Sequence, residues 1–196
     1  LERGMVGIAN GRAEYGPRAL GNRSLLADPR KPENKDLVNE IKKRQKFRPF
    51  APAVLEEHCQ DYFDMPSSSR YMSFVYQCKQ KGAIPAVIHV DGSARVQTVP
   101  EDSVSILRPI LECWYKRTGC PVLLNTSLNV RGEPMVNTLD HANEFSGIGK
   151  GGVGKGQQHA NEFSGLGNQN NDDNGNDGHG GGEGGSSTWV CTAVYD

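Results

Sequence analysis

Apolar residues in the first three quarters of the 196-residue chain follow two periods. Short apolar runs bounded by Gly, Asn, Asp or Pro predict buried strands at Met5–Ala9, Ser24–Ala27 and Pro121–Leu124. Apolar residues spaced by three or four positions predict helices from Pro32 to about Lys43 and from Ile106 to Arg117. This mixture of periods predicts an α/β domain with a sheet at its centre.

Proline and the strand-forming residues define the segments between these elements. Two prolines three residues apart exclude a helix from Phe47 to Leu55, so this segment should be extended and hold Arg48 on a stiff strand. We expect a short helix from Glu56 to Phe63 and a strand from Tyr71 to Cys78. In the last long helix, Trp114 is expected in the core.

The segment from His89 to Val99 predicts a β-hairpin. The Asp-Gly pair at 91–92 is a strong turn signal, and the residues after it alternate. Alternation separates two faces, one with Ala94, Val96 and Thr98 and the other with Arg95, Gln97 and Val99. If the first face lies against the core, Arg95 and Gln97 point outward or into a cleft.

The residues from Gly147 onward differ in composition from those before them. Fifteen of the 24 glycines lie between Gly147 and Gly185, where large apolar residues are almost absent. This composition predicts a folded domain over residues 1–146 and a disordered Gly/Asn-rich tail over residues 147–196. A GxxxxGK pattern at 149–155 lacks the Ser or Thr, the preceding strand and the following helix of a P-loop, so we interpret it as linker.

Charge and cysteine content limit the ligands and the cellular compartment that we expect for the chain. The net charge of −1 hides a basic front, because the segment from Arg12 to Arg48 contains 11 basic and 5 acidic residues. The five cysteines form no CxxC pair and have no histidine at metal-binding spacing, so we expect no metal site and a reducing, cytoplasmic setting. No apolar run approaches the roughly 20 residues that span a bilayer, and we therefore expect no membrane association.

The segment from Gly11 to Ser24, called here the arginine loop, is the first candidate ligand-binding element. Three glycines and a proline restrict its backbone, and it carries Arg12, Arg18 and Arg23. Planar guanidinium groups on a rigid loop suit phosphate or carboxylate ligands. The alternative is a tight turn with solvated arginines.

A second candidate group follows the strand that ends at Leu124. Asn125, Ser127 and Asn129 offer the amide and hydroxyl groups that hold a nucleotide or an acyl group, and the alternative is a polar turn. The lysines at the end of the first long helix have a simpler alternative role as partners of the helix dipole.

Four blocks of sequence resemble, in the same order, the C-terminal domain of the NodU/CmcH/TobZ-type O-carbamoyltransferases. The blocks are Gly16–Ser24, Phe47–Pro52, Val90–Gln97 and Leu124–Pro134. The resemblance implies a YrdC-like α/β fold, a mixed twisted sheet with helices on its faces. It also implies a Lys-x-Arg pair and a Ser-x-Asn pair, here Lys42 with Arg44 and Ser127 with Asn129.

The resemblance also implies an activity. In the family, this domain uses ATP and carbamoyl phosphate to form carbamoyl-adenylate and release pyrophosphate. A larger N-terminal actin-like ATPase-fold domain then passes the carbamoyl group to a hydroxyl. Adenylation depends mostly on positioning and on electrostatic stabilisation of the phosphoryl oxygens, usually with Mg²⁺.

The family's roles fall on eight residues of this chain. The candidate catalytic residues, assigned to the phosphates, are Lys42, Arg44 and Arg48. We expect Arg18 and Arg95 to close on the carbamoyl phosphate or the triphosphate. The hydrogen-bonding side chains that would hold the adenylate are Asn125, Ser127 and Asn129. Arg23 and Arg131 are expected to brace the loops instead.

The chain departs from the family pattern at both ends. The 196 residues match only the family's C-terminal domain, so we expect the acceptor site and the family's metal site, which belong to the N-terminal domain, to lie outside them. The sequence from Gly147 replaces the family's final helix and strand, so we expect the sheet to lack its last strand. Two other interpretations stay open: a nucleic-acid-binding YrdC-like module, which the lack of an aromatic stacking series disfavours, and an inert fragment with an unpaired sheet edge.

Overall fold

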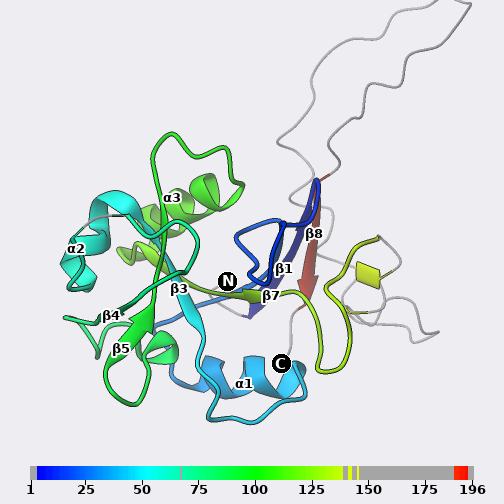
Figure 1. Ribbon diagram of the computed structural model, residues 1–196, viewed down its shortest axis with the longest axis horizontal. Coiled ribbons are helices and arrows are strands. Elements are labelled where there is room, and N and C mark those ends of the chain that lie inside the picture. Colours follow the sequence, from blue (N-terminus) through cyan, green and yellow to red (C-terminus); the bar gives the residue numbers. More distant parts are fainter. Residues whose placement is uncertain (1–3, 67, 139–140, 143–144, 146–187, 194–196) are drawn as a thin grey trace, which may run out of the picture.

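The chain folds around a six-stranded mixed sheet in the order β6-β3-β7-β2-β1-β8 (Figure 1). The structure, a computed structural model, describes residues 4–66, 68–138, 141–142, 145 and 188–193. The strands are β1 (Met5–Asn10), β2 (Arg23–Ala27), β3 (Ala51–Leu55), β6 (Gln97–Val99), β7 (Val122–Ser127) and β8 (Thr188–Ala193). Neighbouring strands are antiparallel except for β3 and β6, which are parallel. The predicted α/β fold with a mixed sheet and helices is confirmed.

Two helices cover opposite faces of this sheet (Figure 1). On one face, Leu107 and Trp114 of α3 (Leu107–Thr118) pack with Leu26 and other strand residues. On the other face, Val38 of α1 (Glu33–Ile41) belongs to the cluster that contains Leu25. Because both faces are covered, β2 and β3 are buried along their whole length. This double burial explains why β3 is apolar throughout and why β2 is apolar at consecutive positions from Leu25 to Ala27.

The shorter elements flank the sheet. They are η1 (Glu56–His58), α2 (Cys59–Tyr62), η2 (Pro85–Val87) and a two-stranded sheet of β4 (Val75–Gln77) and β5 (Ser93–Arg95). The predicted short helix after Leu55 is therefore present as η1 followed by α2.

The predicted long helices are confirmed with small shifts at their ends. Pro32 directly precedes α1, and α3 ends at Gly119, whose φ of 70° gives the left-handed conformation common after helices. Trp114 is 4% exposed, and its Nε1 donates a hydrogen bond to Val122 O at 3.0 Å. The prediction that this tryptophan lies in the core is confirmed.

Two of the predicted β segments are wrong in part. Between Tyr71 and Cys78 only Val75–Gln77 is a strand, because Met72 has a φ of 55° that interrupts extended backbone. The hairpin is limited to a tight turn in which His89 N donates to Ser93 O at 2.7 Å. The single strand predicted after this turn is instead two short strands, of which β5 pairs with β4 and β6 pairs with β3. Gln97 is consequently buried inside the main sheet and does not point outward.

Strand β8 corrects the expectation that the sheet lacks a last strand. It pairs antiparallel with β1, with Asn10 opposite Thr188 and Met5 opposite Ala193. The six residues Thr-Trp-Val-Cys-Thr-Ala are rich in the β-branched and aromatic types that favour strands. The strand was not predicted because the prediction rested on the average composition of the whole segment from Gly147 onward. The linker interpretation of 149–155 and the rest of the tail prediction concern residues outside the described ranges.

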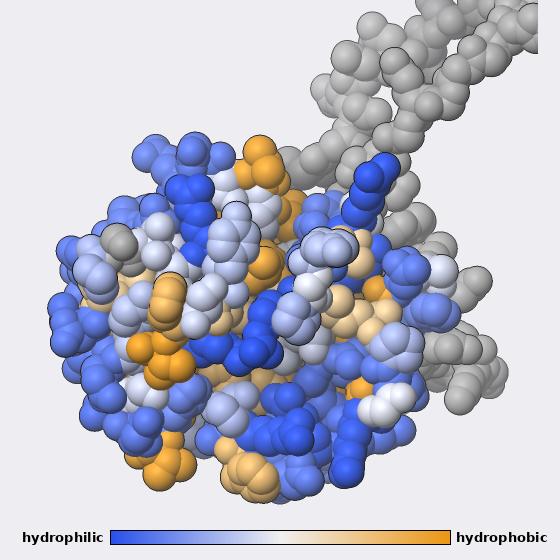
Figure 2. Space-filling model, in the orientation of Figure 1, coloured by the Kyte–Doolittle hydropathy of each residue, from blue (hydrophilic) through white to orange (hydrophobic). Residues whose placement is uncertain are grey.

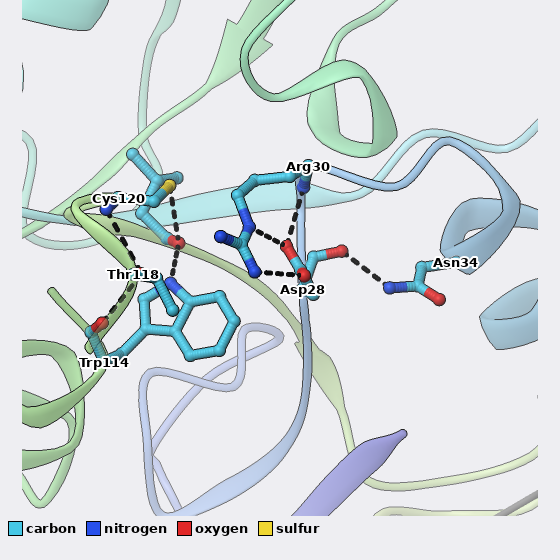
Figure 3. A network of polar contacts seen from close by, with 7 residues as sticks. Asp28, Arg30, Asn34, Trp114, Thr118 and Cys120 are labelled. Atoms are coloured by element: carbon cyan, nitrogen blue, oxygen red, sulfur yellow. Dashed lines mark hydrogen bonds and ion pairs between the residues drawn. The ribbon is translucent and has the colours of Figure 1, made fainter. Parts of the chain in front are cut away.

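A polar network ties β2 to both long helices at the sheet end that lies away from the arginine loop (Figure 3). Arg30 makes two hydrogen bonds to the Asp28 carboxylate, at 2.9 and 2.8 Å, and its guanidinium lies 4.9 Å from the ring centroid of Trp114. Asn34 of α1 donates to Asp28 O at 2.8 Å. Because Asp28 is only 1% exposed, its charge is held by these partners and screened little by solvent.

Replacing Asp28 with Asn should lower the free energy of unfolding by about 1.5–3 kcal/mol, the usual value of a hydrogen bond to a charged group. The substitution keeps the shape of the side chain but removes its charge. Urea denaturation measures the change, and Asp102→Asn on the exposed surface serves as the matched control. Equal stability of the two variants would contradict a structural role for this ion pair.

Candidate functional site

The arginine loop is folded around its own acidic residue. Glu14 Oε1 accepts hydrogen bonds from the backbone N–H groups of Leu20 at 2.7 Å and of Asn22 at 2.6 Å. The Asn22 side chain in turn donates to Arg12 O at 2.9 Å. Hydrogen bonds to a carboxylate are roughly twice as strong as neutral ones. These contacts give the loop a defined conformation, with Arg18 exposed on its outer side.

Arg23 braces the base of this loop. It is buried, and its guanidinium donates to the carbonyl oxygens of Asn10, Gly11 and Val136 at 2.9–3.0 Å. All of these acceptors are backbone groups, so the side chain connects three segments and does not face a ligand. The expectation that Arg23 supports the loops is confirmed.

The loop is fixed to the sheet by two buried amide side chains. Gln97 Nε2 donates to Leu20 O at 3.1 Å, and Asn125 Nδ2 donates to Ala19 O at 3.1 Å. Gly21 has a φ of 131°, and a Cβ at this position would lie 2.6 Å from Ser105 Oγ. Only glycine therefore fits both the backbone conformation and the close approach to the segment before α3.

Lys42 is the centre of the second half of the site. Its Nζ donates to Ser127 O at 2.5 Å, Asn129 O at 2.8 Å and Asn129 Oδ1 at 2.9 Å, and it lies 3.3 Å from Ser127 Oγ. Ser127 Oγ also donates to Asn129 Oδ1 at 2.7 Å. Lys42 of the predicted Lys-x-Arg pair thus contacts both members of the Ser-x-Asn pair at the end of β7, although Lys42 and Ser127 are 85 residues apart in the chain.

The backbone at the end of α1 aims Lys42 at this point. Lys43 N donates to Glu40 O and Arg44 N to Asn39 O, and Lys43 has a φ of 50°. This is the Schellman arrangement, in which a left-handed residue ends the helix and is usually glycine. The reversal also places Lys42 O in contact with the loop after β7, since Arg131 N donates to it at 3.0 Å.

The ammonium of Lys42 lies in an environment that disfavours its charge. The side chain is 4% exposed, and the four oxygens around it are all neutral. Burial, and then the neighbouring charge of Arg44, lower the pKa of Lys42 from 10.5 to about 7. Burial and the charge of Arg48 likewise lower the pKa of Arg44 to about 10. The site is therefore a cluster of cations that favours an anion.

The two arginines of this cluster have different surroundings. Arg44 Nε donates to Asn39 Oδ1 at 2.7 Å, and its guanidinium lies 4.5 Å from the centroid of the Phe50 ring. Arg48 is exposed in a turn before β3, so the prediction that a strand holds it is wrong. The turn is instead fixed by Asn39 Nδ2, which donates to Arg48 O at 3.1 Å.

Arg18 and Arg95 form the other cationic pair. Burial and the charge of Arg18 lower the pKa of Arg95, which places the two guanidinium groups within electrostatic range. Arg95 is half-buried, and its Nε is buried without a hydrogen-bond partner among the described residues. An unpaired buried donor of this kind is rare and is consistent with a ligand contact.

The structure places seven of the eight candidate residues in two groups. The eighth, Asn125, bonds to other parts of the protein. Lys42, Ser127 and Asn129 are in contact. The charge of Arg44 acts on Lys42 and that of Arg48 on Arg44, whereas the charge of Arg18 acts on Arg95. Asn125 uses its amide donors on Gln97 and Ala19. Sequence reasoning missed three supporting residues, which are Glu14, Asn39 and Gln97. Of these, only Asn39 could have been noticed in the sequence, because it is a polar residue next to Val38 on the buried side of α1.

The surface of the domain is mixed, with exposed aromatic side chains at Tyr15 in the arginine loop and at Phe47 beside Arg48. Figure 2 shows apolar residues in separate groups among hydrophilic ones on the face in view. No group of three or more His, Cys, Asp or Glu side chains that could hold a metal ion occurs in the described residues. Within the same ranges, no helix has the length and apolar character needed to cross a membrane.

The pKa of Lys42 has a consequence for stability. Between about pH 7 and pH 10.5, the lysine is deprotonated when folded but protonated when unfolded, so the free energy of unfolding should rise with pH. The limit for one group is about 1.4 kcal/mol per pH unit. Denaturation from pH 7 to pH 10 should show this rise in the wild type and a smaller one in Lys42→Met. Parallel pH profiles for the two proteins would contradict the lowered pKa.

Comparison with known proteins assigns the chain to a family. The family model described as "Carbamoyltransferase C-terminus" matches residues 1–148. Nodulation protein NolO of Bradyrhizobium diazoefficiens is 46% identical over 144 residues, which are 70% of this chain and 26% of NolO. Nodulation protein U of Rhizobium tropici is 48% identical over 124 residues, 62% of this chain and 22% of that protein.

The match to the family model includes every residue of the two cationic groups and the arginine loop. The chain spans about a quarter of the length of the curated relatives it matches. The chain belongs to the carbamoyltransferase C-terminal family.

Proposed function

We propose that this chain binds ATP and carbamoyl phosphate and forms carbamoyl-adenylate. The observation that carries the proposal is the buried ammonium of Lys42, which is surrounded by neutral oxygens and flanked by Arg44 and Arg48. A buried cation without a counter-charge is unfavourable, and an anionic ligand would offset that cost. A polyphosphate supplies several negative charges in the space that such a cluster can cover.

The reaction can be divided between the two cationic groups. Water splits carbamoyl phosphate into phosphate and carbamate, and a carbamate oxygen then attacks the α-phosphorus of ATP as pyrophosphate leaves. In this scheme Lys42, Arg44 and Arg48 stabilise the phosphates of ATP, and Arg18 with Arg95 holds the carbamoyl phosphate. The side chains around Lys42 are cations and amides, so Mg²⁺ would be bound by phosphate oxygens and not by a carboxylate cluster of this chain.

Transfer of the carbamoyl group to a hydroxyl is assigned to another part of a longer protein. The chain corresponds to 26% of the NolO protein, and the remaining length leaves room for a separate acceptor domain. Carbamoyl-adenylate is a reactive mixed anhydride that must be kept from water until it reaches the acceptor. We therefore expect this chain to catalyse ATP–pyrophosphate exchange that depends on carbamoyl phosphate, with no carbamoylated product.

Exchange of radiolabelled pyrophosphate into ATP tests the proposal directly. The expected result is incorporation with carbamoyl phosphate and none with acetyl phosphate or without an acyl phosphate. Binding of duplex RNA that persists in high salt, without nucleotide binding or exchange, would favour the nucleic-acid-binding alternative instead.

Arg48→Ala should weaken ATP binding about 10- to 100-fold, because a charge-assisted hydrogen bond contributes about 1.5–3 kcal/mol. Isothermal titration calorimetry measures this change. Lys46→Ala is the matched control, since Lys46 is an exposed cation in the same turn and should alter the affinity less than twofold. Equal affinities of the two variants would remove Arg48 from the site.

A further inference from the structure

The two cationic groups are attached to neighbouring positions of one strand. Asn125 and Ser127 are two residues apart in β7 and therefore lie on the same face of the sheet. Ser127 accepts from Lys42, and Asn125 donates to Ala19 O in the arginine loop. The end of β7 thus sets the position of both Lys42 and the loop that carries Arg18.

The amide groups of Gln97 and Asn125 have one consistent orientation. Gln97 Nε2 donates to Leu20 O at 3.1 Å, which turns its Oε1 toward Asn125 Nδ2 at 2.7 Å. Asn125 Nδ2 also donates to Ala19 O at 3.1 Å. Rotating either amide by half a turn would place one carbonyl oxygen against another. The pair can therefore hold the arginine loop in a single arrangement.

The backbone of Leu20 is held through both of the peptide groups that flank its Cα. Its N–H donates to Glu14 inside the loop, and its carbonyl accepts from Gln97 in the sheet. Ala19, between this residue and Arg18, is buried. These contacts leave little freedom in the backbone that determines where the exposed Arg18 side chain begins.

We propose that Gln97 and Asn125 are positioning residues that hold Arg18 in place for an anionic ligand. Asn125 Nδ2 donates to Ala19 and Gln97, and its Oδ1 is buried without a partner among the described residues. Because the residue is only 1% exposed, we assign it an action through the loop and no direct contact with the ligand. This inference rests on the proposed function for the assignment of Arg18 to a phosphate group. It replaces the expectation that Asn125 holds the adenylate.

A double-mutant cycle with inorganic pyrophosphate as the probe tests this role. Gln97→Met should weaken pyrophosphate binding about three- to tenfold, the loss of one or two neutral hydrogen bonds. In an Arg18→Ala background the same substitution should change the affinity less than twofold, because the residue acts only through Arg18. Equal weakening in both backgrounds, or no pyrophosphate binding by the wild type, would overturn the proposal.

A measurement without ligand tests the loop itself. Amide hydrogen exchange of Leu20 and Asn22 should be about three- to tenfold faster in Gln97→Met. The control Asn34→Leu removes a similar side-chain bond to a backbone carbonyl at the Asp28 network and should leave both rates unchanged. Unchanged exchange in Gln97→Met would refute the positioning role.

Two further experiments guard against a variant that does not fold and separate this inference from the proposed function. If Gln97→Met does not fold, Glu14→Gln provides the second variant. It should weaken pyrophosphate binding in the wild-type background and have less than a twofold effect in the Arg18→Ala background. Pyrophosphate binding that follows the cycle, without any binding of ATP or carbamoyl phosphate, would support the positioning role and contradict the proposed function alone.

Discussion

The fold of the site depends on the contact between the Lys42 ammonium and the oxygens at the end of β7. A lysine in water would keep its charge at little cost, but here the group is buried among neutral acceptors and its pKa falls to about 7. Four polar contacts hold the ammonium in one place, yet none of them supplies a negative charge. The arrangement fixes the position of the Lys42 amine, and an anionic ligand beside it would favour its charged form.

The sheet explains how distant parts of the chain reach this point. Helix α1 packs on one face and delivers Lys42 from its last turn, while the arginine loop lies at the same end of the sheet and is tied to Gln97 and Asn125. The opposite end of β2 is fixed by Asp28 and Arg30. The Asp28–Arg30 ion pair and the candidate site thus lie at opposite ends of the same strands. Among the residues that the structure describes, no ion pair joins a cation of the site to a carboxylate as Asp28 joins Arg30.

The sequence predicted the parts of this arrangement that depend on local patterns. Runs of apolar residues located β1, β2, β7, α1 and α3. The resemblance to a family singled out Lys42 with Arg44 and Ser127 with Asn129, but not the contact between the two pairs. The role of Asn125 could not be predicted, because its partners Ala19 and Gln97 are far away in the chain and are brought near only by the sheet order. The role of the Glu14 carboxylate could not be predicted for the same kind of reason, since the donors that it accepts from are backbone N–H groups. Strand β8 was missed because its six residues follow a long glycine-rich segment.

Proton uptake on ligand binding tests the central claim most directly. Free Lys42, with a pKa of about 7, is mostly neutral at pH 8, and an anion beside it should raise that pKa and add a proton. Titration of the protein with MgATP at pH 8 in buffers of different ionisation enthalpy should therefore show an uptake of close to one proton, or about 0.9 by the titration of a single group. Lys42→Arg, whose charge is permanent, should show no uptake. Binding of MgATP by the wild type without proton uptake would contradict the assignment of Lys42 to the phosphate site.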